Sequence, residues 1–388
     1  MRRVLLAAAA ALALCGAAGA QDAQDYKASY QAFVAARAAG DADAARAHAV
    51  AAWEAGRTAL PPGETLALLT QNALLEVLWD DAAAAAPMAA EALALGRAGH
   101  GLTNMTLTEL DIAQARTAAS ADGSKAAVAA LAAALAADRA TGRAPNPFAV
   151  TAHDQAFVLA MGVGAHGLAY DLMTPLVAEL RGADAPAEAV ASRELFRAIA
   201  LLVAGRRIDS ALGRDGAGGR WSQRERIEDA HVLIDHAMLA FPPVKTVAEL
   251  EASAIDAHVW HGVVTSLASP FDVNLREEHR FDGLAANPGG DDALLDRPEG
   301  YAESCEMPWT NRRITYPRLR DFYVGGVLIG YDLSAEGRVE NARVLGEVPS
   351  GRFGPHVLRQ VEKWKADVDG LPASCLRDHV ARIIFTTP

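Results

Sequence analysis

Helix-breaking residues recur at a nearly constant interval through the first two thirds of this 388-residue chain. They stand near residues 40, 81, 123, 164 and 205, a spacing of about 41 residues. Between them alanine, a strong helix former, dominates, and apolar residues such as Tyr26, Tyr30 and Phe33 recur on one helical face. One helix pair cannot bury such a face alone, so neighbouring pairs must stack. The spacing predicts an α-helical repeat array over residues 21–285, with an irregular helical bundle as the alternative.

The turn at Gly40-Asp41, followed by an alanine-rich helix, is similar in kind to the turns of tetratricopeptide repeats. The interval is longer than the roughly 34 residues of that family. The similarity implies a solenoid-like domain, which usually offers a concave surface to a protein partner.

Composition and charge exclude several classes of protein. With 51% hydrophobic residues the chain is not disordered. Its 36 basic residues stand against 48 acidic ones, a net charge of −12, so it carries no broad basic face for nucleic acid. Three cysteines are too few for a scaffold built on disulfides.

The first 20 residues have the pattern of a secretory signal peptide. Arg2 and Arg3 precede an apolar stretch, and the small residues of Ala18–Ala20 end it. We expect export, with cleavage after Ala20. Two alternatives stay open: lipidation at Cys15, or an uncleaved anchor in the inner membrane facing the periplasm.

Cleavage would leave Cys305 and Cys375 as the two remaining cysteines, in an oxidising compartment. We expect one disulfide between them. The alternative is a pair of buried free thiols.

The helical pattern fails at Ser269-Pro270, and glycine, proline and aspartate mark a linker over residues 286–310. After it, residues 327–333 and 339–348 read as two strands joined by a turn at Gly337. Residues 354–368 read as a helix, and residues 379–387 as a last strand. The predicted fold class is α+β in two domains, a helical array followed by a small β-β-α-β domain over residues 311–388.

This C-terminal region resembles the C-terminal domain of TonB energy transducers over about 75 residues, from Ile314 to Pro388. The resemblance is carried by the following segments: Tyr316-Pro317, Gly326, Asp332, Gly337-Arg338-Val339, Ala342-Arg343-Val344, Ser350-Gly351, Phe353, Val361 and Trp364-Lys365.

Domains of that family bind an extended segment of an outer-membrane TonB-dependent receptor beside their last strand. Unpaired backbone groups of an edge strand accept a strand from another chain. The resemblance therefore implies a docking strand here, with Arg382 placed to meet an acidic ligand group. Its residues are Val380, Ala381, Arg382, Ile383, Ile384 and Phe385. The alternative is a strand covered by the linker or by the helical array.

The resemblance predicts a non-enzymatic periplasmic protein that engages TonB-dependent transport. To transmit force to a receptor, a transducer must have one end fixed in the inner membrane. Cleavage of the signal peptide would remove that anchor, whereas an uncleaved signal would make the chain an anchored transducer. A periplasmic adaptor that binds other proteins through its array is the further alternative, and a homodimer stays open.

No catalytic or nucleotide-binding motif stands out, so we predict no enzyme activity and no cofactor. His258 and His261 are three residues apart on a predicted helix and could face one metal ion, but no third ligand is evident. His231 and His236 are five apart and point in different directions. We therefore predict no metal site.

Overall fold

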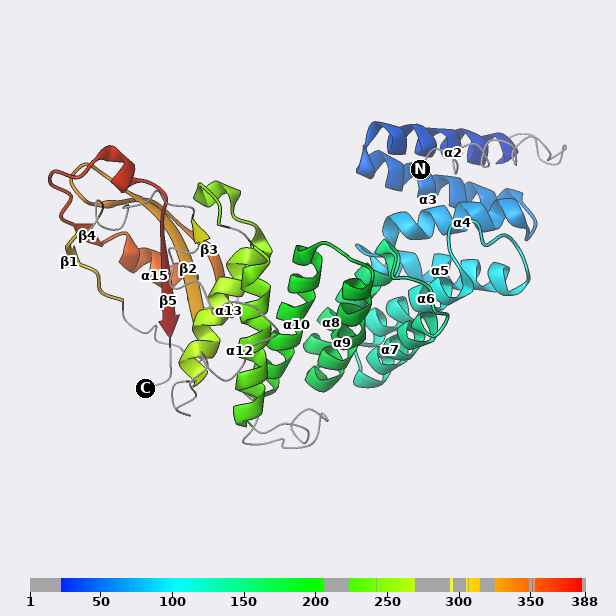
Figure 1. Ribbon diagram of the computed structural model, residues 1–388. Coiled ribbons are helices and arrows are strands. Elements are labelled where there is room, and N and C mark those ends of the chain that lie inside the picture. Colours follow the sequence, from blue (N-terminus) through cyan, green and yellow to red (C-terminus); the bar gives the residue numbers. More distant parts are fainter. Residues whose placement is uncertain are drawn as a thin grey trace. The chain divides into compact units, whose positions relative to one another are not determined.

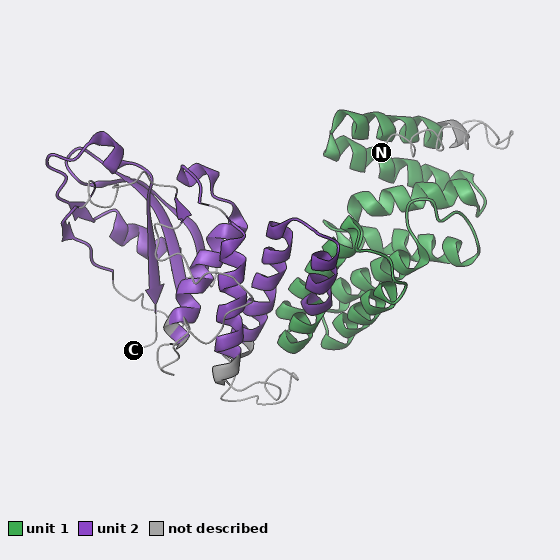
Figure 2. Ribbon diagram, viewed as in Figure 1, with its two compact units in different colours: residues 1–172 green, residues 173–388 purple. Residues whose placement is uncertain are grey.

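The computed structural model describes residues 22–205, 223–241, 243–268, 294–295, 305, 307–314, 325–348, 351 and 353–385. Most of these residues are helical, and a small sheet region stands near the C-terminus, as the α+β prediction requires (Figure 1). The contacts divide the chain into two compact units, residues 1–172 and 173–388 (Figure 2). The predicted signal peptide lies outside the described residues.

Consecutive helices fill the first unit and run into the second. They are α2 (Asp22–Ala39), α3 (Ala42–Ala59), α4 (Glu64–Val77), α5 (Ala82–Arg97), α6 (Leu107–Asp122), α7 (Lys125–Arg139), α8 (Pro147–Gly162) and α9 (His166–Gly182). The predicted breaks near 40, 81, 123 and 164 each fall between two of these helices. The break near 205 coincides with the end of α10 (Ala187–Gly205).

Residues at the breaks end one helix and start the next. Gly40 and Gly123 adopt a left-handed backbone, with φ of 75° and 61°. Asp41 accepts a hydrogen bond from the amide of Ala44, and Asp81 caps α5 in the same way. Each cap satisfies backbone donors that a helix start leaves unpaired. The sequence signals are therefore true helix boundaries.

The predicted apolar faces form the interior of the first unit. Tyr26, Tyr30 and Phe33 of α2 are buried with Trp53 of α3 in one cluster. From α2 to α8, each helix contacts the next along the chain.

The second unit contains α10, α12 (Gln223–Leu239), the short helix η1 (Val247–Glu249), α13 (Ala252–Ala268) and the sheet region. Helix α13 ends where Ser269-Pro270 was predicted to stop the helical pattern. It packs against α12 and also against the sheet.

The main sheet has three antiparallel strands in the order β3-β2-β5 (Figure 1). Strand β2 (Gly325–Leu333) pairs with β3 (Val339–Val348) through the predicted hairpin, and with β5 (His379–Phe385) on its other side. Gly337 turns the hairpin with a φ of 74°, and a Cβ there would collide with the backbone oxygen of Ala366. Two short strands, β1 (Trp309–Asn311) and β4 (Lys365–Ala366), form a separate ladder.

Helix α15 (Gly354–Val361) covers one face of the sheet and is shorter than the predicted helix over 354–368. The chain leaves the helix so that Trp364 is buried in the core and Lys365 can begin β4. The predicted order strand, strand, helix, strand is present, with β4 inserted. This core contains Val327, Ile329 and Phe385 together with Val357 and Val361.

Helix α13 covers the opposite face of the sheet, where glycines let it approach closely. A Cβ on Gly346 would lie 2.5 Å from Ile255 of α13, and one on Gly326 would lie 3.2 Å from Val259. The short helix η1 adds Val247 near Gly330. Both faces of the sheet are therefore packed within the second unit.

The boundary between the two compact units lies at residues 172–173 and does not coincide with the predicted linker. Residues 173–388 form one unit, in which α13 packs on the sheet, and the separate domain over 311–388 stays a prediction. Most of 286–310 lies outside the described residues.

Among the described helices, none combines the length and apolar character needed to cross a bilayer.

Candidate functional site

Strand β5 is the last member of the sheet and pairs on one side with β2. Its seven residues, His379–Phe385, contain the predicted docking residues 380–385 in full. The register runs from Gly325 opposite Phe385 to Tyr331 opposite His379. Among the described strands, the topology thus puts the predicted strand at a sheet edge, where backbone groups alternate between β2 and the outer side.

One side-chain face of β5 belongs to the core beneath α15. Ala381 and Phe385 are buried there, and Ile383 packs against the same cluster. The Phe385 ring stacks on Phe353, with centroids 4.7 Å apart and planes 9° from parallel. These side chains hold the strand in place and are not displayed to a partner.

The other face of β5 meets α13. Ile384 fills the space over Gly262, whose added Cβ would lie 2.5 Å from the Ile384 Cδ1 atom. The Arg382 Nη1 atom lies 3.3 Å from the His258 carbonyl oxygen and 3.3 Å from the His261 Nδ1 atom. The resemblance implied that Arg382 meets an acidic ligand group, but in the structure α13 engages its guanidinium. The Arg382 side chain is therefore part of the contact between β5 and α13.

The start of β5 is fixed by Asp332 of β2. Its carboxylate accepts hydrogen bonds from the Asn341 side chain at 2.9 Å, the Asp378 amide at 2.9 Å and Arg377 at 3.3 Å. Burial alone would raise the pKa of Asp332, but these hydrogen bonds and the Arg377 charge hold the pKa below its usual value. Asp332 therefore ties the hairpin to the approach to β5.

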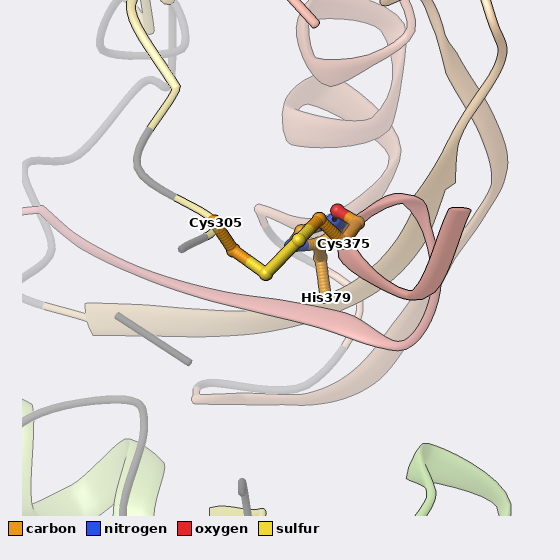
Figure 3. The surroundings of a disulfide bond; sticks show 3 residues. All are labelled: Cys305, Cys375 and His379. Carbon is orange, nitrogen blue, oxygen red and sulfur yellow. Dashed lines mark hydrogen bonds between the residues drawn. A yellow bond between two sulfur atoms is a disulfide. The ribbon is translucent and has the colours of Figure 1, made fainter. Parts of the chain in front are cut away.

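A disulfide joins Cys305 and Cys375 just before β5, as the sequence led us to expect (Figure 3). Their Cα atoms are 5.2 Å apart, and 70 positions of sequence separate them. The His379 Nε2 atom lies 2.9 Å from the Cys375 carbonyl oxygen, and the His379 ring stacks on Tyr331. The bridge therefore attaches the segment before β1 to the start of the edge strand.

A cluster of titratable side chains lies between α12 and α13. The His231 Nδ1 atom is 3.1 Å from Asp235 Oδ2, and the His261 Nε2 atom is 3.3 Å from Asp235 Oδ1. Burial alone would raise the pKa of Asp235, but the two histidines lower it to about 2. These three residues carry the types of atoms that bind metals.

The sequence pointed to a different pair of histidines. His258 is buried beside His261, but it is not a member of the cluster. Burial first, then Arg382 and His261, lower the pKa of His258 to about 3. The signal that could have found the cluster is the spacing of His231 and Asp235, four residues apart on one helix face.

A shallow cavity of about 130 Å³ lies near the end of α12. Exposed Glu188, Glu249 and Glu251 contribute carboxylates to its lining, and the other lining residues are apolar. The lining contains no nucleophile beside a base, so it supports no catalytic proposal.

No protein-family model matches the chain, and neither a curated protein nor a solved structure matches it.

Proposed function

We propose that this protein is a non-enzymatic periplasmic binding protein, which takes an extended segment of another protein along the outer edge of β5. The observation that carries the proposal is the strand order β3-β2-β5, with β5 at one end. Strand addition uses main-chain hydrogen bonds for affinity. Following the TonB resemblance, the partner is the periplasmic segment of an outer-membrane TonB-dependent receptor.

The packing of β5 supports this mode of binding over recognition by its side chains. Phe385 is buried beneath α15, and Ile384 and Arg382 lie against α13. A strand held on both faces and by β2 presents a rigid backbone edge, so little entropy is lost there when a partner adds.

A pair of proline variants tests the proposal in the full chain. Adjacent residues of an edge strand direct their N–H groups alternately inward and outward. Of Ile383→Pro and Ile384→Pro, one removes an N–H group that bonds β2, and the other removes an outward one. Proline is tolerated in edge strands where the lost N–H group faces outward.

The binding assay uses synthetic peptides from the periplasmic segments of TonB-dependent receptors of the same genome. We expect the folded proline variant to bind about tenfold or more weakly, because it loses a hydrogen bond and its ring obstructs the added strand. Ile383→Ala is the matched control, since it keeps the N–H group and should bind like the unsubstituted chain. A folded proline variant with unchanged affinity would exclude the edge as the docking site.

A second candidate function is a periplasmic adaptor that binds partners through a helical repeat array. It is favoured by the spacing of about 41 residues between breaks, the first four of which fall between helices. Partners captured equally by the unsubstituted chain and by both proline variants would favour this function. If residues 1–20 stay attached as an anchor, the strand-binding protein becomes an energy transducer, which an intact mass from the membrane fraction would reveal.

A further inference from the structure

The cluster between α12 and α13 has the ligand types of a transition-metal site. His231 and Asp235 lie one turn apart on α12, and His261 faces them from α13. The two histidines are 6% and 7% exposed. Two imidazoles with one carboxylate suit Zn²⁺ and its neighbours in the first transition row better than Ca²⁺ or Mg²⁺, which prefer oxygen ligands.

The separations of the ligand atoms also fit a metal ion. All three atoms lie within 4.8 Å of one another, with Asp235 oxygens 3.1 Å and 3.3 Å from the two histidine nitrogens. Bonds of about 2.1 Å in a tetrahedral site place neighbouring ligands about 3.4 Å apart. The 3.1 Å separation involves Asp235 Oδ2 and the 3.3 Å separation involves Asp235 Oδ1, so either oxygen as the ligand has one separation already near the required value. Three protein ligands leave the fourth position to water.

Arg382 of β5 competes with a metal ion at this cluster. Its Nη1 atom lies 3.3 Å from His261 Nδ1, and a guanidinium only donates, so Nδ1 accepts and the ring proton sits on Nε2. Ligation through Nε2 requires that proton on Nδ1, where it would face the N–H groups of Arg382. The metal and the hydrogen bond between Arg382 and His261 are therefore mutually exclusive.

We propose that His231, Asp235 and His261 form a binding site for a divalent transition metal of the Zn²⁺ class, which fills only when Arg382 releases His261. The inference is independent of strand docking, since its ligands lie on α12 and α13. Arg382 nevertheless connects the metal-binding cluster to the edge strand β5, because it extends from β5 to contact α13.

The test is a titration of the untagged, chelator-treated full chain with Zn²⁺, by calorimetry and by competition with a chromophoric chelator. We expect one ion per chain. Asp235→Asn and His261→Gln should weaken binding by about tenfold or more, because each removes a ligand or its charge. Arg382→Met should strengthen binding by about tenfold, because it removes a nearby positive charge and the competing hydrogen bond.

His258→Gln is the matched control. His258 lies on α13 like His261 and is similarly buried, but it is outside the cluster. We therefore expect the variant to retain its Zn²⁺ affinity. If a ligand variant fails to fold, spectroscopy of the unsubstituted chain still tests whether these residues bind the metal ion. Co²⁺ should then give the intense visible absorption of a site with few ligands, and Zn²⁺ should shift the ring ¹⁵N resonances of two histidines.

Three results would overturn the proposal. The first is no binding, or weak binding of several ions that the variants leave unchanged, which means surface adsorption only. The second is loss of binding in His258→Gln alone, which assigns different ligands. The third is an Arg382→Met variant whose Zn²⁺ affinity is unchanged or lower, which would show that Arg382 does not compete with the metal ion.

Discussion

Gly262 of α13 is the point where the close contact between helix and edge strand can be tested most sharply. An added Cβ would lie 2.5 Å from Ile384 Cδ1, 2.9 Å from Arg382 Cδ and 3.0 Å from Ile384 Cγ1. The perturbation is Gly262→Ala, made alone and together with Ile384→Val. Valine lacks the Cδ1 atom, so the second change removes the nearest obstacle to the added methyl group.

The expected magnitudes follow from two opposing effects. Alanine in a helix interior gains up to about 1 kcal/mol over glycine. Overpacking a filled contact costs about 1–3 kcal/mol, so Gly262→Ala alone should destabilise by about 1 kcal/mol. Ile384→Val alone should cost about 1 kcal/mol. In the valine background the overpacking is relieved, so the double variant should be at least about 1 kcal/mol more stable than the sum of the single changes predicts.

The assay is urea denaturation of all four proteins, followed by tryptophan fluorescence and circular dichroism. Gly162→Ala at the end of α8 is the control, because an added Cβ there meets no atom within 4 Å. It should be neutral or stabilising and should add independently to Ile384→Val. Additivity of Gly262→Ala and Ile384→Val within about 0.5 kcal/mol would refute the packing of α13 on β5.

Three further predictions concern other parts of the chain. Replacing Cys305 and Cys375 by serine should destabilise the second unit by about 4 kcal/mol, because the bridge closes a loop spanning 70 positions. Gly337→Ala should destabilise by about 2 kcal/mol or more, and Gly370→Ala by about 1 kcal/mol, since both have a positive φ but only Gly337 faces a backbone oxygen. Burial lowers the pKa of His153 from 6.5 to about 4, so the unfolded chain binds its proton more readily. Stability from this neutral ring is complete above about pH 6.5, and about 3 kcal/mol of it is lost as the pH falls to about 4.

Each of these predictions has a measurement that can contradict it. Denaturation midpoints that do not respond to reductant would exclude a stabilising bridge. Equal costs for the two glycine substitutions would mean that the carbonyl contact at Gly337 is absent. The His153 effect is read as the difference between the unsubstituted chain and His153→Gln from pH 7 to pH 4. A difference that does not change with pH would show that the ring is not buried in its neutral form.

The sequence predicted the elements that depend on local patterns. The hairpin followed from alternating residues and a glycine at the turn. The predicted breaks near residues 40 and 81 fall between helices, where Asp41 and Asp81 cap the helix that follows. The end of α15 was missed, because Trp364 continues the apolar period although the chain has already left the helix. Periodicity reports which face is buried, and not where the backbone changes conformation.

The other features that escaped prediction are contacts between segments far apart in sequence. Nothing local to Arg382 indicates that α13, over 120 positions earlier, engages its guanidinium. Gly326 and Gly346 weaken a strand pattern when considered alone, and their purpose becomes clear only with α13 packed against them. The cluster at Asp235 likewise needs two helices brought together, so a search limited to spacing within one helix selected His258 in its place.

We propose that β5 receives a strand at its outer edge, and amide hydrogen exchange tests this proposal most directly. The full chain would be measured by NMR with and without a receptor peptide that binds it. We expect bound peptide to slow exchange at alternate amides within residues 379–385, the outward ones, while the amides bonded to β2 change little. Unchanged exchange along β5, with new protection confined to the helices of the first unit, would contradict it and favour the adaptor function.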